Sequence, residues 1–283
     1  MSEGGEIIVK PIVDGFVGEI TGLDLASGLG ARTKSLLSRA HEGFPVLAIR
    51  DLSLNADSFM AFGAVFGDFE IDHHLPQFQD KDHRSVVYLT NRDENGEPDP
   101  ASAKRGAAWH ADSTYKEHPC DHTLLYVMAM PGKGAGTHFA DMYRAYAALP
   151  GDLKEVIENR QAKHKFAAGP ADGGVIPMTE EQDEMHPTVL HPMVRVHPTT
   201  GRKSLNVNPL HVHGIVGMGQ DESKGLLNKI FEHAMNPAFQ YHHTYLVGDL
   251  VIWDQRCTWH RAEAAYGMAE HRLLMRAKII APS

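Results

Sequence analysis

Short apolar segments separated by turn residues dominate the chain from residue 86 onward. They include SVVYLT, GAAWHADSTY, TLLYVMAM, DLVIWD and LLMRAKII, and turns such as MPGKGAG and HPTTGRK divide several of them. Short runs enriched in β-branched and aromatic residues predict β-strands. Because many short strands with Pro and Gly turns favour a sandwich or barrel over a parallel βαβ sheet, we expect a mainly β fold with flanking helices.

Apolar residues at helical spacing predict helices around these strands. We expect a hairpin over residues 6–20 and four helices. The first covers residues 31–42, the second starts at Ala56 after Asn55 as its N-cap, the third lies near 152–160, and the fourth covers 221–235. In the second helix Phe59, Phe62 and Phe66 recur at the helical period, so we interpret them as core residues. Residues 165–190, rich in Gly, Pro and acidic residues, predict a lid or insertion within a single domain over 1–283. A linker is the alternative, but strands resume after it.

Composition and charge exclude several kinds of partner. Hydrophobic residues make up 42% of the 283 residues, and the formal net charge is −9. No Lys/Arg run exceeds a dipeptide, which argues against nucleic acid or an anionic membrane as partner. No apolar stretch approaches the ~18 residues of a membrane span, and the first residues show no secretory signal. With only two cysteines, we expect a cytoplasmic protein.

The stretch GAAWHADSTY carries His110 and Asp112 two positions apart. Residues i and i+2 of a strand point to the same face, so the imidazole and the carboxylate can reach one point. They form an N,O ligand pair, and one further histidine would complete the 2-His-1-carboxylate face of non-haem Fe(II) oxygenases. His260, in DLVIWDQRCTWHRAE, is a candidate. A polar strand edge and a structural histidine are the alternatives from the residues alone.

Arg272 and Arg276, in HRLLMRAKII, lie four positions apart and therefore on one face of a strand. Two cations on an otherwise apolar strand are costly unless each meets an anion. Because a guanidinium holds a carboxylate through two parallel hydrogen bonds, the pair indicates two bound carboxylates or similar anions. Salt bridges to Asp or Glu of the protein are the alternative.

The order of four motifs, WHADSTY, PGKGAGTHFADM, WDQRCTWHRA and HRLLMRAKI, resembles the taurine dioxygenase and phenoxyacetate-herbicide dioxygenase (TauD/TfdA) family. The resemblance covers nearly the whole chain and includes GEITGLDL, FGAVFGDFE and HPMVRVHPTTGRKSL. It implies a double-stranded β-helix, a cupin-like jelly roll, and a homo-oligomeric dioxygenase that uses Fe(II), 2-oxoglutarate and O2. WHADSTY resembles the branch that cleaves aryloxyalkanoate ethers.

The resemblance also implies roles for individual residues. His110, Asp112 and His260 would hold the iron, and Thr137 would hydrogen-bond 2-oxoglutarate. Arg272, twelve residues after His260, would pair with the far carboxylate of that cosubstrate. The metal and the cosubstrate would perform the oxidation, and the protein would position the substrate.

The substrate implied by the resemblance is a small organic anion held by Arg276. Further substrate contacts are expected from His73, His74, Asn91 and His213. Hydroxylation next to a heteroatom would release a phenol and an oxo acid from an aryloxyalkanoate, or sulfite from a taurine-like sulfonate, together with succinate and CO2.

Two other classes remain to be weighed. A zinc hydrolase could use the same three ligands, but it needs a general base near the metal, and Glu263 is the nearby acidic candidate in sequence. A non-catalytic β-barrel could hold an organic anion, although such a binder has no use for an open metal face.

Overall fold

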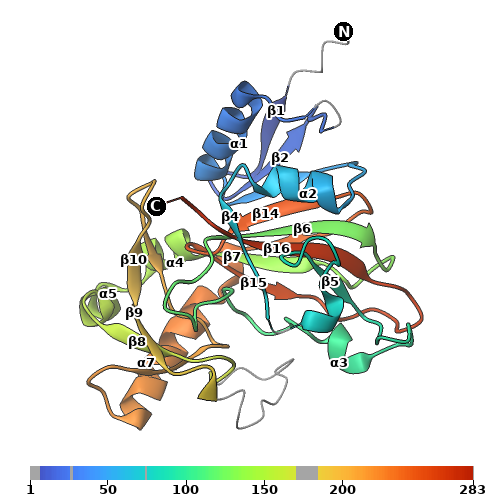
Figure 1. Ribbon diagram of the computed structural model, residues 1–283. Helices are drawn as coiled ribbons and strands as arrows, with labels where there is room; N and C mark the ends of the chain where they lie inside the picture. Colours follow the sequence, from blue (N-terminus) through green and yellow to red (C-terminus); the bar gives the residue numbers. More distant parts are fainter. Residues whose placement is uncertain (1–6, 26–27, 74, 170–183, 283) are drawn as a thin grey trace.

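An eight-stranded sheet forms the larger layer of the computed structural model. Its strands follow in the order β1 (Ile8–Val13), β2 (Val17–Thr21), β3 (Val46–Ile49), β14 (Leu250–Asp254), β6 (His122–Ala129), β16 (Leu273–Ile280) and β4 (Asp68–Glu70), and β5 (Val87–Thr90) also pairs with β16. Neighbours are antiparallel except β2 and β3. β14 and β16 flank β6, so the last part of the chain lies in the centre of the sheet (Figure 1).

A three-stranded antiparallel sheet of β13 (Gln240–His243), β7 (Thr137–Asp141) and β15 (Thr258–Ala262) packs against the larger one. Phe139 of β7 contacts Trp253 of β14 with ring centroids 5.4 Å apart, and both belong to one buried cluster. Two antiparallel sheets packed face to face around an apolar core define a jelly-roll sandwich. The expected fold class is therefore confirmed.

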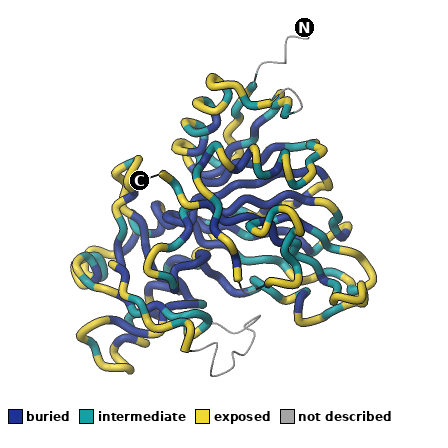
Figure 2. Tube along the Cα trace, in the orientation of Figure 1, coloured by how far each residue is buried: buried dark blue, intermediate teal, exposed yellow. Residues whose placement is uncertain are grey.

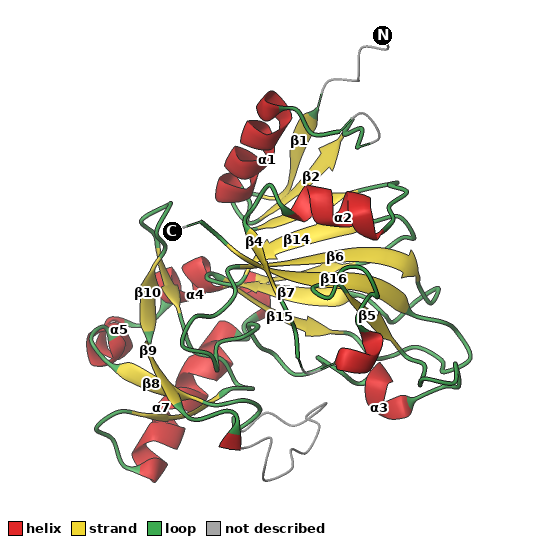
Figure 3. Ribbon diagram, viewed as in Figure 1, coloured by secondary structure: helices red, strands yellow, loops and turns green. Residues whose placement is uncertain are grey.

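Helices and two smaller sheets complete the fold (Figure 3). The helices are α1 (Ala31–Gly43), α2 (Ala56–Gly63), α3 (Pro100–Ala103), α4 (Met142–Ala148), α5 (Gly151–Ile157) and α7 (Gln220–Ala234), with 3₁₀ turns at Pro76–Phe78 and Pro237–Phe239. The smaller sheets are β12 (Val212–Ile215), β8 (Gln161–His164) and β9 (Val189–Pro192), and β10 (Val194–Val196) with β11 (Lys203–Leu205). Leu37 of α1 and Phe59 of α2 pack on the larger sheet, whereas α4 and α7 join a second cluster with Trp259 of β15.

The four predicted helices and the hairpin are confirmed. Asn55 caps α2 through a capping box, in which its side chain accepts from the Ser58 amide and the Ser58 hydroxyl accepts from the Asn55 amide. Phe59, Phe62 and Phe66 are buried, as predicted. α4 has no predicted counterpart; the Asp141 carboxylate starts it by accepting from two backbone amides of its first turn.

The structure describes residues 7–25, 28–73, 75–169 and 184–282. Most of the predicted lid at 165–190 therefore lies outside the described residues. Within the described ranges, buried residues run through the interior of the molecule and exposed ones lie on its outer segments (Figure 2), and no helix is long and apolar enough to cross a membrane.

Candidate active site

His110, Asp112 and His260 converge although 150 residues separate the two histidines. His110 Nε2 lies 3.5 Å and His260 Nε2 lies 4.0 Å from the same oxygen, Asp112 Oδ1. One donor atom from each residue falls within 4.8 Å of the other two, and all three side chains are buried. Two imidazoles and a carboxylate on one side of a point match the ligand face that non-haem Fe(II) prefers.

Hydrogen bonds aim the Asp112 carboxylate. Its Oδ2 accepts from Thr123 Oγ1 at 2.8 Å and from Gln255 Nε2 at 2.9 Å, while Gln255 Oε1 accepts from the Asp112 amide at 2.9 Å. These bonds leave Oδ1 facing the two histidines. Burial alone would raise the pKa of Asp112, but its contacts with His110, His260 and Lys278 hold the pKa well below the usual range. The carboxylate is therefore ionised, as a metal ligand requires.

The two histidines are oriented differently. His110 Nδ1 lies 2.8 Å from the Ala108 carbonyl oxygen, which fixes a proton on Nδ1 and leaves Nε2 with a free lone pair. His260 Nδ1 is buried and has no hydrogen-bond partner among the described residues. Burial lowers the pKa of His260 to about 3, and His110 beside it acts in the same direction. A neutral imidazole in a buried pocket is the form that binds metal.

The prediction of a strand over GAAWHADSTY is wrong. His110 forms only an isolated β-bridge with His260, through backbone bonds of 3.0 and 2.8 Å, and a turn follows in which Ser113 adopts φ +59°. The turn lets the segment leave the sheet while Gln255 and Thr123 hold Asp112. The side chains of His110 and Asp112 meet because of these polar contacts, and not because of strand alternation.

The candidate cosubstrate residues line the same cavity as the three possible ligands. Thr137 is held by a hydrogen bond from the Tyr245 hydroxyl to its Oγ1 at 3.0 Å. Arg272 directly precedes β16, and its amide donates to Asn91 Oδ1 at 2.9 Å. The Nε atom of Arg272 is buried without a hydrogen-bond partner among the described residues. Such a guanidinium fits a carboxylate that arrives with a cosubstrate.

Arg276 also lines the cavity but meets an anion of the protein. Its Nη2 pairs with Asp72 Oδ2, and Lys278 Nζ approaches the same oxygen at 3.1 Å. For this residue the alternative of a salt bridge to a protein carboxylate is realised. Sequence reasoning missed Asp72, because the stretch IDHHLP offers no pattern that places it against β16.

The other four substrate candidates lie differently. His73 is exposed, and His74 is outside the described residues. Asn91 is buried, and its amide donates to the Glu270 carbonyl oxygen while its Oδ1 accepts from Arg272, so it fixes the segment that carries Arg272. His213 lies near Thr188, 3.3 Å away, and neither His73 nor His213 lines the cavity.

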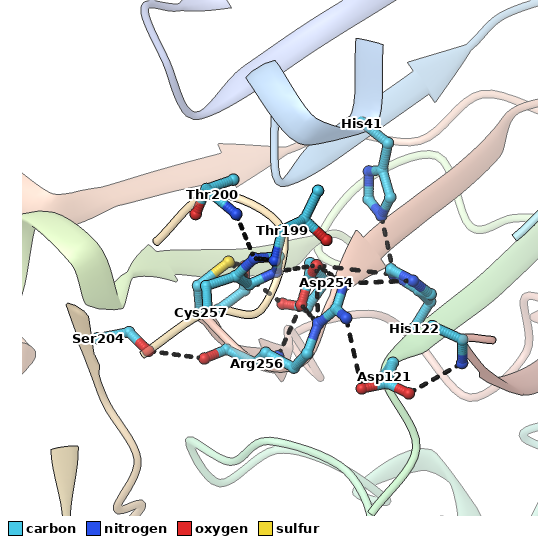
Figure 4. A network of polar contacts seen from close by, with 12 residues as sticks. His41, Asp121, His122, Thr199, Thr200, Ser204, Asp254, Arg256 and Cys257 are labelled. Carbon is cyan, nitrogen blue, oxygen red and sulfur yellow. Dashed lines mark hydrogen bonds and ion pairs between the residues drawn. The ribbon is translucent and has the colours of Figure 1, made fainter. Parts of the chain in front are cut away.

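A second buried group of two histidines and a carboxylate, His41, His122 and Asp254, also has metal-like spacing. The negative charge of Asp254 is already neutralised by a cation of the protein (Figure 4): Arg256 pairs with both carboxylate oxygens, and His197 Nε2 lies 3.0 Å from Oδ2. His41 Nε2 and His122 Nδ1 hydrogen-bond each other at 3.0 Å. The guanidinium takes the place that a cation would need, so we interpret this cluster as structural.

Buried histidines predict a loss of stability in mild acid. Burial lowers the pKa of His41 to about 4 and that of His164 to about 3, against about 6.5 in an unfolded chain. The unfolded state therefore binds more protons between pH 6.5 and 4, and the free energy of unfolding falls as pH falls through this window. At pH 5 each histidine would cost roughly 2 kcal/mol relative to pH 7.

Urea unfolding at pH 7 and pH 5 measures this loss. His164 is fully buried, and its ring nitrogens have no partner among the described residues, so His164→Leu should keep the packing and reduce the difference between the two pH values. Equal unfolding free energies of the unmodified protein at both pH values would contradict the prediction.

An antiparallel jelly roll with a buried face of two histidines and one carboxylate is typical of the class of non-haem Fe(II) oxygenases. Comparison with known proteins agrees: the pattern of the family "Taurine catabolism dioxygenase TauD, TfdA family" matches residues 9–278. The chain belongs to this family, and the resemblance seen in the motifs is confirmed. It is accordingly an enzyme whose cofactor is Fe(II) and whose cosubstrates are 2-oxoglutarate and O2.

Three relatives illustrate the similarity. The chain is 29% identical to the alpha-ketoglutarate-dependent 2,4-dichlorophenoxyacetate dioxygenase of Cupriavidus pinatubonensis, over 96% of both chains. It is 31% identical to the (S)-phenoxypropionate/alpha-ketoglutarate-dioxygenase of Sphingobium herbicidovorans, over 96% of this chain and 94% of the relative. A crystal structure of AAD-2 with Mn(II) and N-oxalylglycine superposes with a TM-score of 0.85 at 28% identity, covering 99% of this chain and 98% of the other.

Proposed function

We propose that this enzyme hydroxylates an aryloxyalkanoate next to its ether oxygen and so releases a phenol and an oxo acid, with succinate and CO2. The cavity that joins the metal-binding face to partly buried arginines carries the proposal. Its apolar lining includes Leu89, Leu125 and Trp253, which suit an aromatic ring. Relatives named for 2,4-dichlorophenoxyacetate and phenoxypropionate support the substrate class.

In this proposal, His110, Asp112 and His260 hold Fe(II), and Thr137 and Arg272 hold 2-oxoglutarate. When bound, the iron and the cosubstrate supply the oxidising chemistry. Gln255 and Thr123 keep the carboxylate of Asp112 in place and Asn91 keeps Arg272 in place, so the residues that would bind the two groups are preorganised. The protein's further task is to hold the carbon to be oxidised beside the metal.

The hydrolase alternative is weakened by the place of Glu263. Its carboxylate pairs with His242 at 3.0 Å and accepts from the Gly136 amide at 3.2 Å, and Glu263 does not line the cavity. A general base must reach the water or substrate that it deprotonates. Glu263, the candidate general base of the zinc hydrolase, is thus engaged in contacts outside the cavity.

Two finer expectations belong to the same proposal. A cytoplasmic location is supported by Cys120 and Cys257, which are both buried and free, as in a reducing compartment. A homo-oligomeric state is expected from the family resemblance, and sedimentation of the purified protein measures it.

The test is a substrate screen under air with Fe(II) and 2-oxoglutarate, with succinate as the readout. We expect succinate and a phenol in equal amounts from phenoxyacetate or from one enantiomer of 2-phenoxypropionate, and little from taurine. Anaerobic addition of Fe(II) and 2-oxoglutarate should give a visible charge-transfer band. If sulfonates alone drive succinate formation, the aryloxyalkanoate proposal is wrong; if no compound does and no band forms, the assigned site is wrong.

A further inference from the structure

Tyr245 is a buried tyrosine that lies outside the four motifs and does not itself line the cavity. It follows the end of β13 by two positions. Its ring packs in the buried cluster that contains Phe139 and Trp253, and it lies edge-to-face with the ring of His243, with centroids 4.7 Å apart. Because close packing fixes the ring, the phenol hydroxyl has a defined place.

The backbone on both sides of Tyr245 is anchored by charged side chains. Arg50 Nη1 donates to the Thr244 carbonyl oxygen at 3.3 Å, and Asp249 Oδ2 accepts from the Leu246 amide at 2.7 Å. Arg50 and Asp249 also pair with each other. Both chain neighbours of Tyr245 are thus held by the protein, so the position of the phenol does not depend on a ligand.

The hydroxyl of Tyr245 donates to Thr137 Oγ1 at 3.0 Å, and both side chains are buried. Burial raises the pKa of Tyr245 to about 12, so the phenol keeps its proton at neutral pH. A hydroxyl has one proton to donate and two lone pairs that accept. Because Thr137 accepts from Tyr245, its own proton remains available to an acceptor inside the cavity that Thr137 lines.

Arg272 brings a positive charge to the same part of the cavity. It lines the cavity together with Thr137, and it lies close enough to Tyr245 for its charge to oppose the effect of burial on the pKa of the phenol. The Nε atom of Arg272 is buried without a partner in the described part of the chain. A carboxylate at this place would meet the guanidinium and the Thr137 hydroxyl together. Hydrogen bonds that follow one another toward an anion strengthen each other in a buried site.

We propose that Tyr245 is a positioning residue for 2-oxoglutarate, which donates to Thr137 and so turns the Thr137 proton toward the carboxylate that Arg272 pairs with. The inference rests on the proposed function, in which Thr137 and Arg272 hold the cosubstrate, and it adds the residue that sets the direction of the Thr137 hydrogen bond. Without the phenol, the Thr137 hydroxyl is free to rotate and must be ordered when the cosubstrate binds, which costs affinity. Tyr245 therefore contributes to the recognition of the far carboxylate.

The test is a calorimetric titration of 2-oxoglutarate into the Zn(II)-loaded enzyme under argon. Tyr245→Phe removes only the hydroxyl and should raise the Kd for 2-oxoglutarate about three- to tenfold, the usual contribution of one hydrogen bond. 2-Oxopentanoate has the same chain with a methyl group in place of the far carboxylate, and it should bind the variant and the unmodified enzyme equally. With Fe(II) and saturating 2-oxoglutarate, the visible charge-transfer band should keep its wavelength, because the metal end of the cosubstrate is unchanged.

Thr137→Val separates this role of Tyr245 from simple packing. In the Thr137→Val enzyme, the further change Tyr245→Phe should alter the Kd for 2-oxoglutarate less than twofold, because no threonine hydroxyl is left to direct. The proposal is overturned if Tyr245→Phe alone leaves the Kd unchanged. It is also overturned if Tyr245→Phe weakens binding by the same factor with and without the Thr137 hydroxyl, since Tyr245 then acts only through packing.

Tyr241→Phe is the matched control. Tyr241 lies on β13 and packs against the same buried cluster, but its hydroxyl hydrogen-bonds His243 Nδ1 at 3.2 Å and not a residue of the cavity. Its Kd for 2-oxoglutarate should stay within twofold of the unmodified enzyme, and a loss equal to that of Tyr245→Phe would count against the proposal. If the unmodified enzyme binds no 2-oxoglutarate, the assigned cosubstrate site has failed instead. If it binds 2-oxoglutarate but oxidises no aryloxyalkanoate, the substrate class alone is wrong and the role of Tyr245 is still decided by these titrations.

Discussion

Replacing Asp112 with Ala is expected to lower succinate formation by more than about 100-fold, since loss of even an outer partner of a metal ligand costs 10–100-fold. The substitution removes Oδ1, the oxygen that both histidines approach. It also frees Thr123 and Gln255, which both donate to the other oxygen. The purified variant should hold much less iron, and assays of succinate and of bound iron measure the two losses separately.

Asp141→Asn is the matched control for this variant. Asp141 is another buried carboxylate, but it caps α4 by accepting from the amides of Tyr143 and Arg144, and Asn caps helices equally well. Its iron content and turnover should stay within twofold of the unmodified enzyme. An Asp112→Ala enzyme with full iron and normal turnover would show that the metal lies elsewhere. A protein that merely bound an anion would keep its affinity for phenoxyacetate after the change, with no turnover before or after it.

Removing Arg256 is expected to destabilise the fold by about 3–5 kcal/mol, the usual cost of leaving one partner of a buried ion pair alone. Arg256 pairs with Asp254 through Nε and Nη2 and lies near Asp121 (Figure 4). Its positive charge and hydrogen bonds help to hold the pKa of Asp254 well below the usual range, although burial would raise it. In Arg256→Met the carboxylate would remain buried, with histidine neighbours and the backbone amide of residue 256 as partners but no cation paired with it. Urea unfolding at pH 7 gives the change in free energy.

Lys203→Met provides the comparison for Arg256→Met. Lys203 pairs with Glu158 on the surface, where the two side chains are 44% and 31% exposed. Exposed pairs contribute little because water and salt screen them, so this variant should lose only a small fraction of the stability lost by Arg256→Met. Equal losses in the free energy of unfolding would mean that the buried pair of Arg256 and Asp254 stabilises the fold no more than a surface pair does.

The sequence predicts well what depends on local periodicity and on residue types with few possible roles. The helix α2 is predictable because its N-cap, Asn55, and its aromatic residues at helical spacing are local signals that lie within a few turns of the chain. The order of the TauD/TfdA motifs identifies three candidate metal ligands, His110, Asp112 and His260. The structure brings their side chains together in one cavity. The arginines of HRLLMRAKII also reach that cavity, as their spacing predicts.

What the sequence could not predict depends on partners far apart in the chain. GAAWHADSTY has the composition of a strand, but bonds from Thr123 and Gln255 hold Asp112 in a turn. Arg276 meets Asp72 across 204 positions, and no local pattern marks either residue as the other's partner. Tyr245 meets Thr137 across 108 positions, and the stretch HHTYLV carries no signal that its hydroxyl reaches a residue of the cavity.

The insertion of β14 and β16 on either side of β6 has a consequence for synthesis. A ribosome that has released residues up to about 245 has produced β6 but neither of the strands that pair with it, Leu250–Asp254 and Leu273–Ile280. Loops this long must close before such pairings stabilise anything. The centre of the sheet can therefore assemble only after residues 250–280 have been synthesised, and His260 can join His110 only at that stage.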